Sequence, residues 1–184
     1  YQRAIVALDK IKTKDVDIQY AYQKIAYFRG IELFNSEKIG YTNKDFTNYN
    51  AAIFYFQKSL EFPIDNKITA LANYWRAESY YRVGNMSKAL QYYAVFKSSS
   101  EAILLPEYKE VDYNIGYAYL GLNDYGPAIK SFRNYLNKHQ GEKTKKVNDA
   151  NLRTGDSYLI IKGQDDLLLS LKYYQAVLDM QVTG

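Results

Sequence analysis

The sequence predicts an all-α protein built as a solenoid of antiparallel helix pairs. Two spacings recur four times each: a small residue three positions before a Leu or Tyr, and an Ala or Ser four positions before an aromatic residue. The third observation is that no segment alternates polar and apolar residues for long enough to indicate a strand. Such long repeats are typical of solenoids, in which each repeat buries its apolar face only against its neighbours.

The first helix of each pair carries the small residue, and the second carries the Ala or Ser. The first-helix motifs are Gly30-x-x-Leu33, Ala77-x-x-Tyr80, Gly116-x-x-Tyr119 and Gly155-x-x-Tyr158. The second-helix motifs are Ala52-x-x-x-Phe56, Ala89-x-x-x-Tyr93, Ala128-x-x-x-Phe132 and Ser170-x-x-x-Tyr174. Two antiparallel helices approach closely only where one presents a small residue and the other an aromatic ring that fills the gap. We therefore expect leucine at Gly116 or Ala128 to overpack this contact and to destabilise the protein by about 1–3 kcal/mol.

The expected units are a leading half repeat and four helix pairs, at residues 1–14, 17–63, 68–102, 106–140 and 146–181. The repeats differ in length mainly through two polar insertions, Ser36 to Thr47 and Lys162 to Asp166, because added loop residues cost little entropy. Pro127 suits the first turn of a helix, and Asn123-Asp124 before it suits a helix cap. We expect one solenoid over residues 1–184, as a segment of a longer array.

These motifs resemble the tetratricopeptide repeat (TPR), a helix–turn–helix of 34 residues that stacks into a right-handed solenoid. The agreement is best in Tyr113-Asn-Ile-Gly-Tyr-Ala-Tyr-Leu120, followed by Ala128-Ile129-x-x-Phe132. Tyr74-Trp-Arg-Ala-Glu-Ser-Tyr-Tyr81 with Ala89-Leu90-x-x-Tyr93 is the next best. The chain departs from the family where the early Trp of each repeat is replaced, by Ala26, Asn73, Asp112 and Asn151. The resemblance implies the fold and a role in protein binding, but it names no partner.

A second resemblance concerns the compartment. The chain has 21 tyrosines among 184 residues, long loops, and a Tyr-x-Arg-Gly segment at Tyr27 to Gly30. In these features it is similar to TPR proteins of the Gram-negative cell envelope, among them outer-membrane assembly lipoproteins and Tol-Pal-associated factors. The resemblance implies a bacterial periplasmic or envelope location, with the cytoplasm as the alternative. The absence of cysteine is compatible with both, and no apolar run approaches the roughly 18 residues of a membrane span.

Charge and reactive side chains argue against nucleic-acid binding and catalysis. The net charge of +4 is small and dispersed, and we interpret the basic stretch from Lys143 to Lys146 as a solvated loop. The only histidine, His139, lies in an expected helix-end turn, where it is solvated or caps the helix. Asp165 and Asp166 are adjacent and do not share a helix face, so they form a poor acid–base pair. We predict no enzyme activity, no catalytic residue, no metal site and no cofactor.

The surface of the first helices remains, and in the TPR fold this surface lines a concave groove. Carried over by position, the resemblance places these partner-binding residues in the groove: Tyr27, Phe28, Tyr74, Trp75, Glu78, Arg82, Tyr113, Asn114, Tyr117, Arg153 and Asp156. Aromatic and Arg side chains dominate the binding energy of many interfaces. The alternative is that these rings pack between consecutive first helices and expose little surface.

One TPR subfamily binds C-terminal carboxylates through Lys, Asn and Arg side chains on its first helices. Only Asn114 and Arg153 coincide with that pattern here, while Tyr74, Glu78 and Asp149 occupy the other positions. The carboxylates of Glu78 and Asp149 would repel a carboxylate ligand, so we reject this activity.

The sequence therefore favours a protein–protein interaction scaffold that holds an extended peptide or a partner helix in an aromatic-lined groove. The alternative is binding of a carbohydrate or cell-wall glycan by stacking on Tyr and Trp rings. A nucleic-acid adaptor would need a basic stripe that the sequence lacks. We expect protein partners, no nucleic acid and no membrane span. We also expect end-to-end self-association, because no polar capping helix follows Leu178 to Met180.

Overall fold

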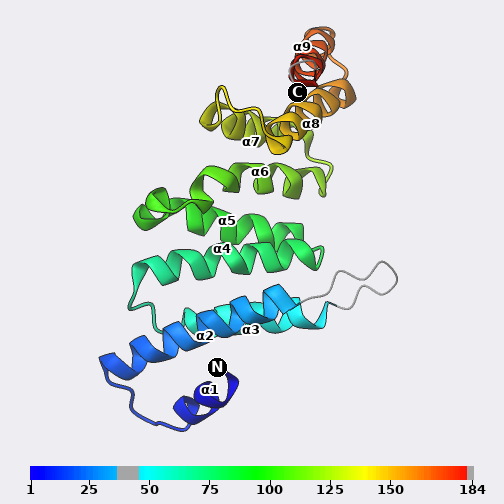
Figure 1. The fold of residues 1–184 in the computed structure, drawn as a ribbon. Coiled ribbons are helices and arrows are strands. Elements are labelled where there is room, and N and C mark those ends of the chain that lie inside the picture. Colours follow the sequence, from blue (N-terminus) through cyan, green and yellow to red (C-terminus); the bar gives the residue numbers. More distant parts are fainter. Residues whose placement is uncertain (37–45, 182–184) are drawn as a thin grey trace. The chain divides into compact units, whose positions relative to one another are not determined.

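The computed structural model describes residues 1–36 and 46–181, and within these residues every regular element is helical. The predicted all-α fold is thus confirmed (Figure 1). The helices are α1 (Gln2–Asp9), α2 (Val16–Ser36), α3 (Thr47–Ser59), α4 (Asn66–Arg82), α5 (Met86–Ser98), the 3₁₀ helix η1 (Ser100–Leu104), α6 (Glu107–Leu120), α7 (Tyr125–Lys138), α8 (Lys145–Ile161) and α9 (Gln164–Gln181). Most of the insertion expected between Ser36 and Thr47 lies outside the described residues.

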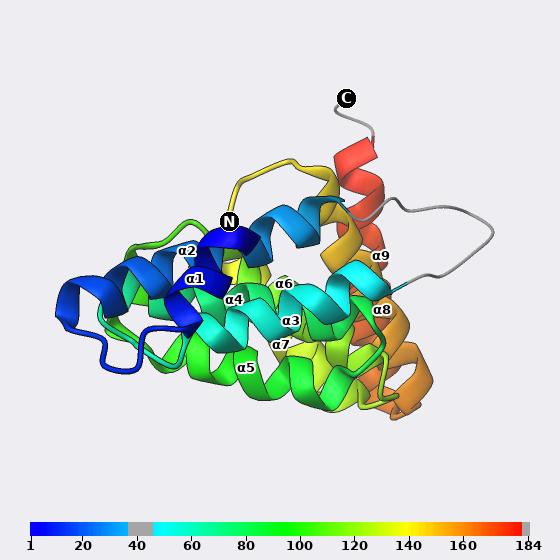
Figure 2. The ribbon, with the colours of Figure 1, turned by 90° about the horizontal axis from the view of Figure 1, so that it is seen from below.

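The chain divides into two compact units, Tyr1–Leu105 (unit 1) and Pro106–Gly184 (unit 2). In unit 1, α1 packs on α2, α2 pairs with α3, α3 packs on α4, and α4 pairs with α5. In unit 2, α6 pairs with α7, α7 packs on α8, and α8 pairs with α9. Figure 2 shows α2 beside α3 and α8 beside α9. We call α2, α4, α6 and α8 the A helices and their partners the B helices. The single array over residues 1–184 stays a prediction.

The expected contact between small and aromatic residues is present inside the helix pairs. An added Cβ would lie 2.6 Å from a ring carbon of Phe56 at Gly30, 2.7 Å from Phe132 at Gly116 and 2.7 Å from Tyr174 at Gly155. Non-bonded carbon atoms are most stable about 3.5–4.0 Å apart, so these three positions have no room for a side chain. The A and B helices therefore touch through a glycine and a ring, as the spacing indicates.

Each unit buries its own apolar core around these contacts. In unit 1 one cluster contains Tyr27, Leu33, Ala52, Phe56, Ile68 and Ala72. A second cluster in unit 1 contains Ile5, Tyr22 and Ala26, where α1 covers α2. The core of unit 2 contains Ala128, Phe132, Tyr135, Val147 and Ala150. Removal of this apolar surface from water is the main force that holds the helix pairs together.

The fully buried Gln23 ties three segments of unit 1 together. Its Nε2 donates to the carbonyl of Asp65 at 3.1 Å and to Oγ1 of Thr69 at 3.0 Å, while its Oε1 accepts from the N–H of Asp65 at 2.7 Å. Its own carbonyl accepts from Oγ of Ser59 at 2.9 Å. These bonds fasten the turn between α3 and α4 to α2, because a buried amide is stable only when its polar atoms are paired.

Several helix starts in the described residues use side-chain caps that the sequence analysis did not predict. Asp65, Asn85 and Thr144 accept bonds from the N–H three residues later at 3.0, 3.1 and 3.2 Å, and so begin α4, α5 and α8. Asp124 stands at the cap of α7, but its side chain makes no capping bond, so that expectation is wrong. Its neighbour Asn123 instead adopts φ of 58°, in the left-handed region that Asn tolerates, and forms the turn.

Candidate interaction faces of the A helices

Some predicted groove residues of unit 1 lie inside the helix packing. Tyr27, Tyr74 and Glu78 are only 9%, 6% and 8% exposed. The ring of Tyr27 packs on Phe56 with centroids 6.1 Å apart, and Tyr74 packs on Phe96 at 5.2 Å. These side chains face the B helices, so they support the surface of the A helices without forming much of it.

Of the predicted groove residues of unit 1, Phe28, Trp75 and Arg82 are accessible. Phe28 on α2 is exposed and stacks on Tyr1 with ring centroids 5.8 Å apart. Trp75 on α4 is half-buried, and its ring makes an edge-on contact with Phe34 on α2 at 5.1 Å. Arg82 is the exposed last residue of α4, and its spacing of seven places it on the same helix face as Trp75. An aromatic seam thus joins α2 to α4 and leaves an indole and a cation accessible.

Glu78 has a structural partner inside its own helix pair. The hydroxyl of Tyr93 on α5 donates to Oε1 of Glu78 on α4 at 2.5 Å, in the buried interior. Burial, followed by the charge of Glu78, raises the pKa of Tyr93 well above its ordinary value. Tyr93 therefore stays a neutral donor, and the carboxylate of Glu78 points into the protein.

The same bond recurs in the last helix pair, and the sequence contains a signal for it. Asp156 follows Gly155 as Glu78 follows Ala77, and its Oδ1 accepts from the hydroxyl of Tyr174 at 2.9 Å. In the other two helix pairs the B-helix ring is Phe, and the residue after the small one carries no charge. This residue is Ile31 in the pair that contains Phe56 and Tyr117 in the pair that contains Phe132. A carboxylate therefore stands at this position only where a tyrosine hydroxyl is available to bind it.

A polar network joins the A helices of unit 2. Oδ2 of Asp149 on α8 accepts from the hydroxyl of Tyr113 at 2.9 Å and from the hydroxyl of Tyr117, both on α6. Nε of Arg153 donates to the oxygen of Tyr117 at 3.3 Å and lies 3.4 Å from Oδ1 of Asp149. Nη1 of Arg153 donates to Oδ2 of Asp156 at 2.9 Å. Asp149, which the sequence analysis left out of the site, thus contacts three predicted groove residues, and Arg153 links a fourth, Asp156.

The network holds its side chains in place, and its two phenols stay neutral near pH 7. Burial, followed by the bond to Asp149, raises the pKa of Tyr113 and of Tyr117. Neutral phenols cannot act as general bases. The side chains of Arg153 and Asp156 are 36% and 37% exposed, so both remain accessible. Asn114, the other predicted residue of this face, follows Tyr113 on α6 and is half-buried.

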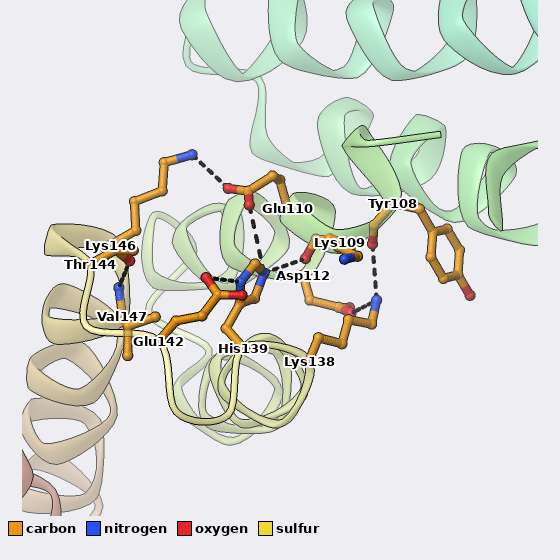
Figure 3. Close-up of polar contacts among 10 residues, drawn as sticks. All are labelled: Tyr108, Lys109, Glu110, Asp112, Lys138, His139, Glu142, Thr144, Lys146 and Val147. Atoms are coloured by element: carbon orange, nitrogen blue, oxygen red, sulfur yellow. Dashed lines mark hydrogen bonds and ion pairs between the residues drawn. The ribbon is translucent and has the colours of Figure 1, made fainter. Parts of the chain in front are cut away.

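His139 is the C-cap residue of α7, as expected, but it is buried rather than solvated. Its ring lies 4.2 Å from that of Tyr135, centroid to centroid. Nδ1 is 3.0 Å from Oε2 of Glu142, and Nε2 is 3.4 Å from the carbonyl oxygen of Lys109 and 3.6 Å from Oε1 of Glu110 (Figure 3). Both ring nitrogens face acceptors, so His139 fastens the connection between α7 and α8 to α6.

The basic residues near this histidine are paired with carboxylates. Nζ of Lys138 lies 2.7 Å from Oδ2 of the buried Asp112, and Nζ of Lys146 lies 2.7 Å from Oε2 of Glu110 (Figure 3). Lys146 is also the second residue of α8, so the expected solvated loop is already helical there. The pairing supports the interpretation that these lysines do not form a phosphate-binding patch.

The described residues offer neither a metal site nor a membrane-spanning helix. In residues 1–36 and 46–181, no three His, Cys, Asp or Glu side chains are grouped so that they could hold a metal ion. No helix in the same ranges combines the length and apolarity that a membrane span needs. The absence of a metal site, a cofactor and a catalytic residue stays a prediction from the sequence.

Known proteins share this fold. Residues 113–137 match the family model described as tetratricopeptide repeat. The structure of a MamA double mutant is similar with a TM-score of 0.64 and 16% identity, covering 88% of this chain and 76% of that chain. Residues 113–137 are a tetratricopeptide repeat, and the chain has the fold of TPR proteins.

Two further structures support the same conclusion about the fold. A second MamA structure has a TM-score of 0.59 and 19% identity, with 90% of this chain and 88% of that chain covered. The structure of TPR-like repeats from a kinesin light chain protein of Podosopora anserina has a TM-score of 0.63 and 8% identity. The match covers 99% of this chain and 83% of that chain. At these identities the likeness establishes the fold alone. No curated protein sequence matches the chain closely enough to be called a relative.

Proposed function

We propose that this protein is a non-catalytic scaffold that binds a partner protein, as an extended peptide or a helix, on the exposed faces of its A helices. The TPR match supports protein binding in general. The observation that carries the finer proposal is the network in unit 2, where Asp149 holds Tyr117 and Arg153 in place while Arg153 stays accessible. Side chains that are already fixed lose little entropy when a partner binds.

The proposed contact residues form one set in each unit. They are Phe28, Trp75 and Arg82 in unit 1, and Tyr113, Asn114, Tyr117, Arg153 and Asp156 in unit 2. Aromatic and Arg side chains are the residue types that most often carry interface energy. Tyr27, Tyr74 and Glu78 belong to the supporting layer beneath this surface, because they are buried.

Affinity purification with paired variants tests this proposal. Trp75→Ala/Arg82→Ala removes the accessible groups of unit 1, and Asn114→Ala/Arg153→Ala removes those of unit 2. Lys88→Ala/Lys130→Ala is the matched control, because both lysines are exposed on B helices. We expect the wild type and the control to capture the same partner protein. At least one of the two A-helix variants is expected to lose it. Equal capture by all folded variants would place the binding surface elsewhere.

Glycan binding is the second candidate, favoured by the half-buried indole of Trp75 beside Phe34. Trp75 is the only tryptophan, so its fluorescence reports this face directly. Titration with cell-wall oligosaccharides is expected to leave the emission unchanged if the protein is a peptide scaffold. A saturable shift that Arg82→Ala weakens would favour the glycan function instead.

The proposed location is the bacterial periplasm or cell envelope. It rests on the resemblance of the Tyr-rich, long-looped repeats to envelope TPR proteins. Fractionation of source cells with an antibody against the native protein tests it. Recovery in the cytoplasmic fraction, with a periplasmic marker separated, would contradict this location and leave the scaffold proposal unaffected.

A further inference from the structure

An exposed aliphatic patch lies where α8 ends and α9 begins, at the turn drawn in orange in Figure 1. On α9, Leu167, Leu168 and Leu171 are 51%, 67% and 56% exposed. Ile160 and Ile161 at the end of α8 are about as exposed. A pocket of about 370 Å³ opens in this turn, lined by Tyr158, Leu159, Lys162, Gly163 and Leu167. Exposed aliphatic side chains gathered in one region of a protein surface often mark an interaction site.

Comparison with the other helix pairs shows that the repeat itself does not require this patch. Aligned on the small residue of the A helix, Ile160 corresponds to Asn35, Arg82 and Gly121. Aligned on the small residue of the B helix, Leu168 corresponds to Asn50, Ser87 and Gly126. Both positions are polar or glycine in the other three pairs. Aliphatic residues at these two positions are therefore specific to the α8–α9 pair, whereas Leu171 has the aliphatic counterparts Ile53, Leu90 and Ile129.

The charges around Leu168 have a twofold pattern. Asp165, Leu168 and Lys172 are spaced by three and four residues, so they lie on one face of α9. Asp165 and Lys172 are equally far from the point between Leu168 and Leu169, with opposite charges on the two sides. Both are exposed, and neither forms an ion pair within residues 1–36 and 46–181.

We propose that this face of α9 binds the same face of α9 in a second copy of the chain, with the two helices antiparallel. A twofold axis beside Leu168 places Asp165 of each copy opposite Lys172 of the other, so a single patch satisfies both sides of the contact. Leu168 of each copy is buried near the twofold axis, at the centre of the contact. A second copy is the occupant because this face carries both an acidic and a basic residue, which pair with the basic and the acidic residue of an identical face.

Sedimentation equilibrium of charge-reversal variants tests this pairing. The wild-type chain is expected to dimerise as its concentration rises from about 1 µM to about 500 µM. Asp165→Lys and Lys172→Asp each place like charges opposite one another twice, so each is expected to weaken the dimer by about tenfold or more. The double variant Asp165→Lys/Lys172→Asp restores both ion pairs and is expected to recover wild-type association. Leu168→Gln is expected to weaken the dimer without changing the charge.

Lys130→Asp is the matched control, because Lys130 holds in α7 the position that Lys172 holds in α9. This variant is expected to dimerise like the wild type, and circular dichroism of every variant checks that the helices are intact. A wild type that stays monomeric throughout overturns the proposal. So does a dimer that the single reversals leave unchanged, or one that the double reversal fails to restore. The proposed partner-binding faces are not altered by these variants, so the two proposals fail independently.

Discussion

The two units join their consecutive A helices by different chemistry. In unit 1, Phe34 on α2 and Trp75 on α4 meet through their rings. In unit 2, Tyr113 and Tyr117 on α6 donate hydrogen bonds to Asp149 on α8. The contact within each helix pair, a small residue against a ring, is the same in both units. Because that contact sets how closely the helices of a pair approach, the seam between A helices can be apolar or polar without changing the fold.

The largest expected effect concerns the shared contact. Gly30→Leu and Gly116→Leu each push a side chain into a ring that already lies under 3 Å from an added Cβ. We expect each to lower the free energy of unfolding by about 3 kcal/mol. Urea denaturation followed by circular dichroism measures this loss.

A matched glycine provides the control for that measurement. Gly126 has no atom within 4 Å of an added Cβ, so Gly126→Ala is expected to change stability by no more than about 0.5 kcal/mol. Similar midpoints for Gly116→Leu and Gly126→Ala would show that the glycine–ring contact does not set the spacing of the pair.

The next largest effect separates the two seams. Asp149→Ala removes the acceptor of two tyrosine hydroxyls and a neighbour of Arg153, and it is expected to destabilise unit 2 by about 2 kcal/mol. Trp75 lies in unit 1, so its fluorescence follows that unit, while circular dichroism follows both. We expect Asp149→Ala to shift the circular dichroism transition more than the fluorescence transition. An equal shift in both signals would mean that the seams are not independent.

A smaller effect compares the two carboxylate–tyrosine bonds. Tyr93→Phe removes a hydroxyl donor from the buried Glu78, whereas Tyr174→Phe removes one from Asp156, which keeps its bond to Arg153. We expect a loss of about 1.5 kcal/mol for Tyr93→Phe and about 0.5 kcal/mol for Tyr174→Phe. Thermal or urea unfolding of both variants measures the difference, and the reverse order would contradict this account of Glu78.

The smallest effect is a dependence on alkaline pH in unit 2. Burial raises the pKa of Tyr113 and Tyr117, and it raises the pKa of Tyr135 to about 12. Tyrosines of the unfolded chain ionise near pH 10. Since the folded state keeps these hydroxyls protonated, their contribution to stability is complete below about pH 10 and is lost as the pH rises towards 12 and beyond.

Urea midpoints measured across this range test the alkaline effect. Tyr113→Phe/Tyr117→Phe is expected to reduce the slope of stability against pH, while Phe34→Leu in the apolar seam is expected to leave the slope unchanged. If stability falls with pH at least as steeply in Tyr113→Phe/Tyr117→Phe as in the wild type, Tyr113 and Tyr117 do not cause the alkaline effect.

The packing inside the helix pairs could be predicted from local spacing, whereas the surface could not. Gly116 and Phe132 were paired correctly, because an i, i+3 or i, i+4 motif already determines which residues share a helix face. His139 was misjudged because its burial depends on Lys109 and Glu110, which lie about 30 residues earlier on another helix. The role of Glu78 was missed, although the matching of Glu78 with Tyr93 and Asp156 with Tyr174 was visible in the aligned repeats.

Local spacing alone specifies the helical repeat, the small-to-aromatic contact and the helices on which the candidate binding residues lie. Helix periodicity is a local property, so it can be inferred from one segment at a time. Which of those residues are accessible follows from the packing of helices that are distant in the sequence. Tyr74 and Glu78 turn inward while Trp75 and Arg153 remain partly exposed, because exposure depends on what the neighbouring helices cover. The same holds for Asp149, whose importance comes from two hydroxyls that a different helix brings to it.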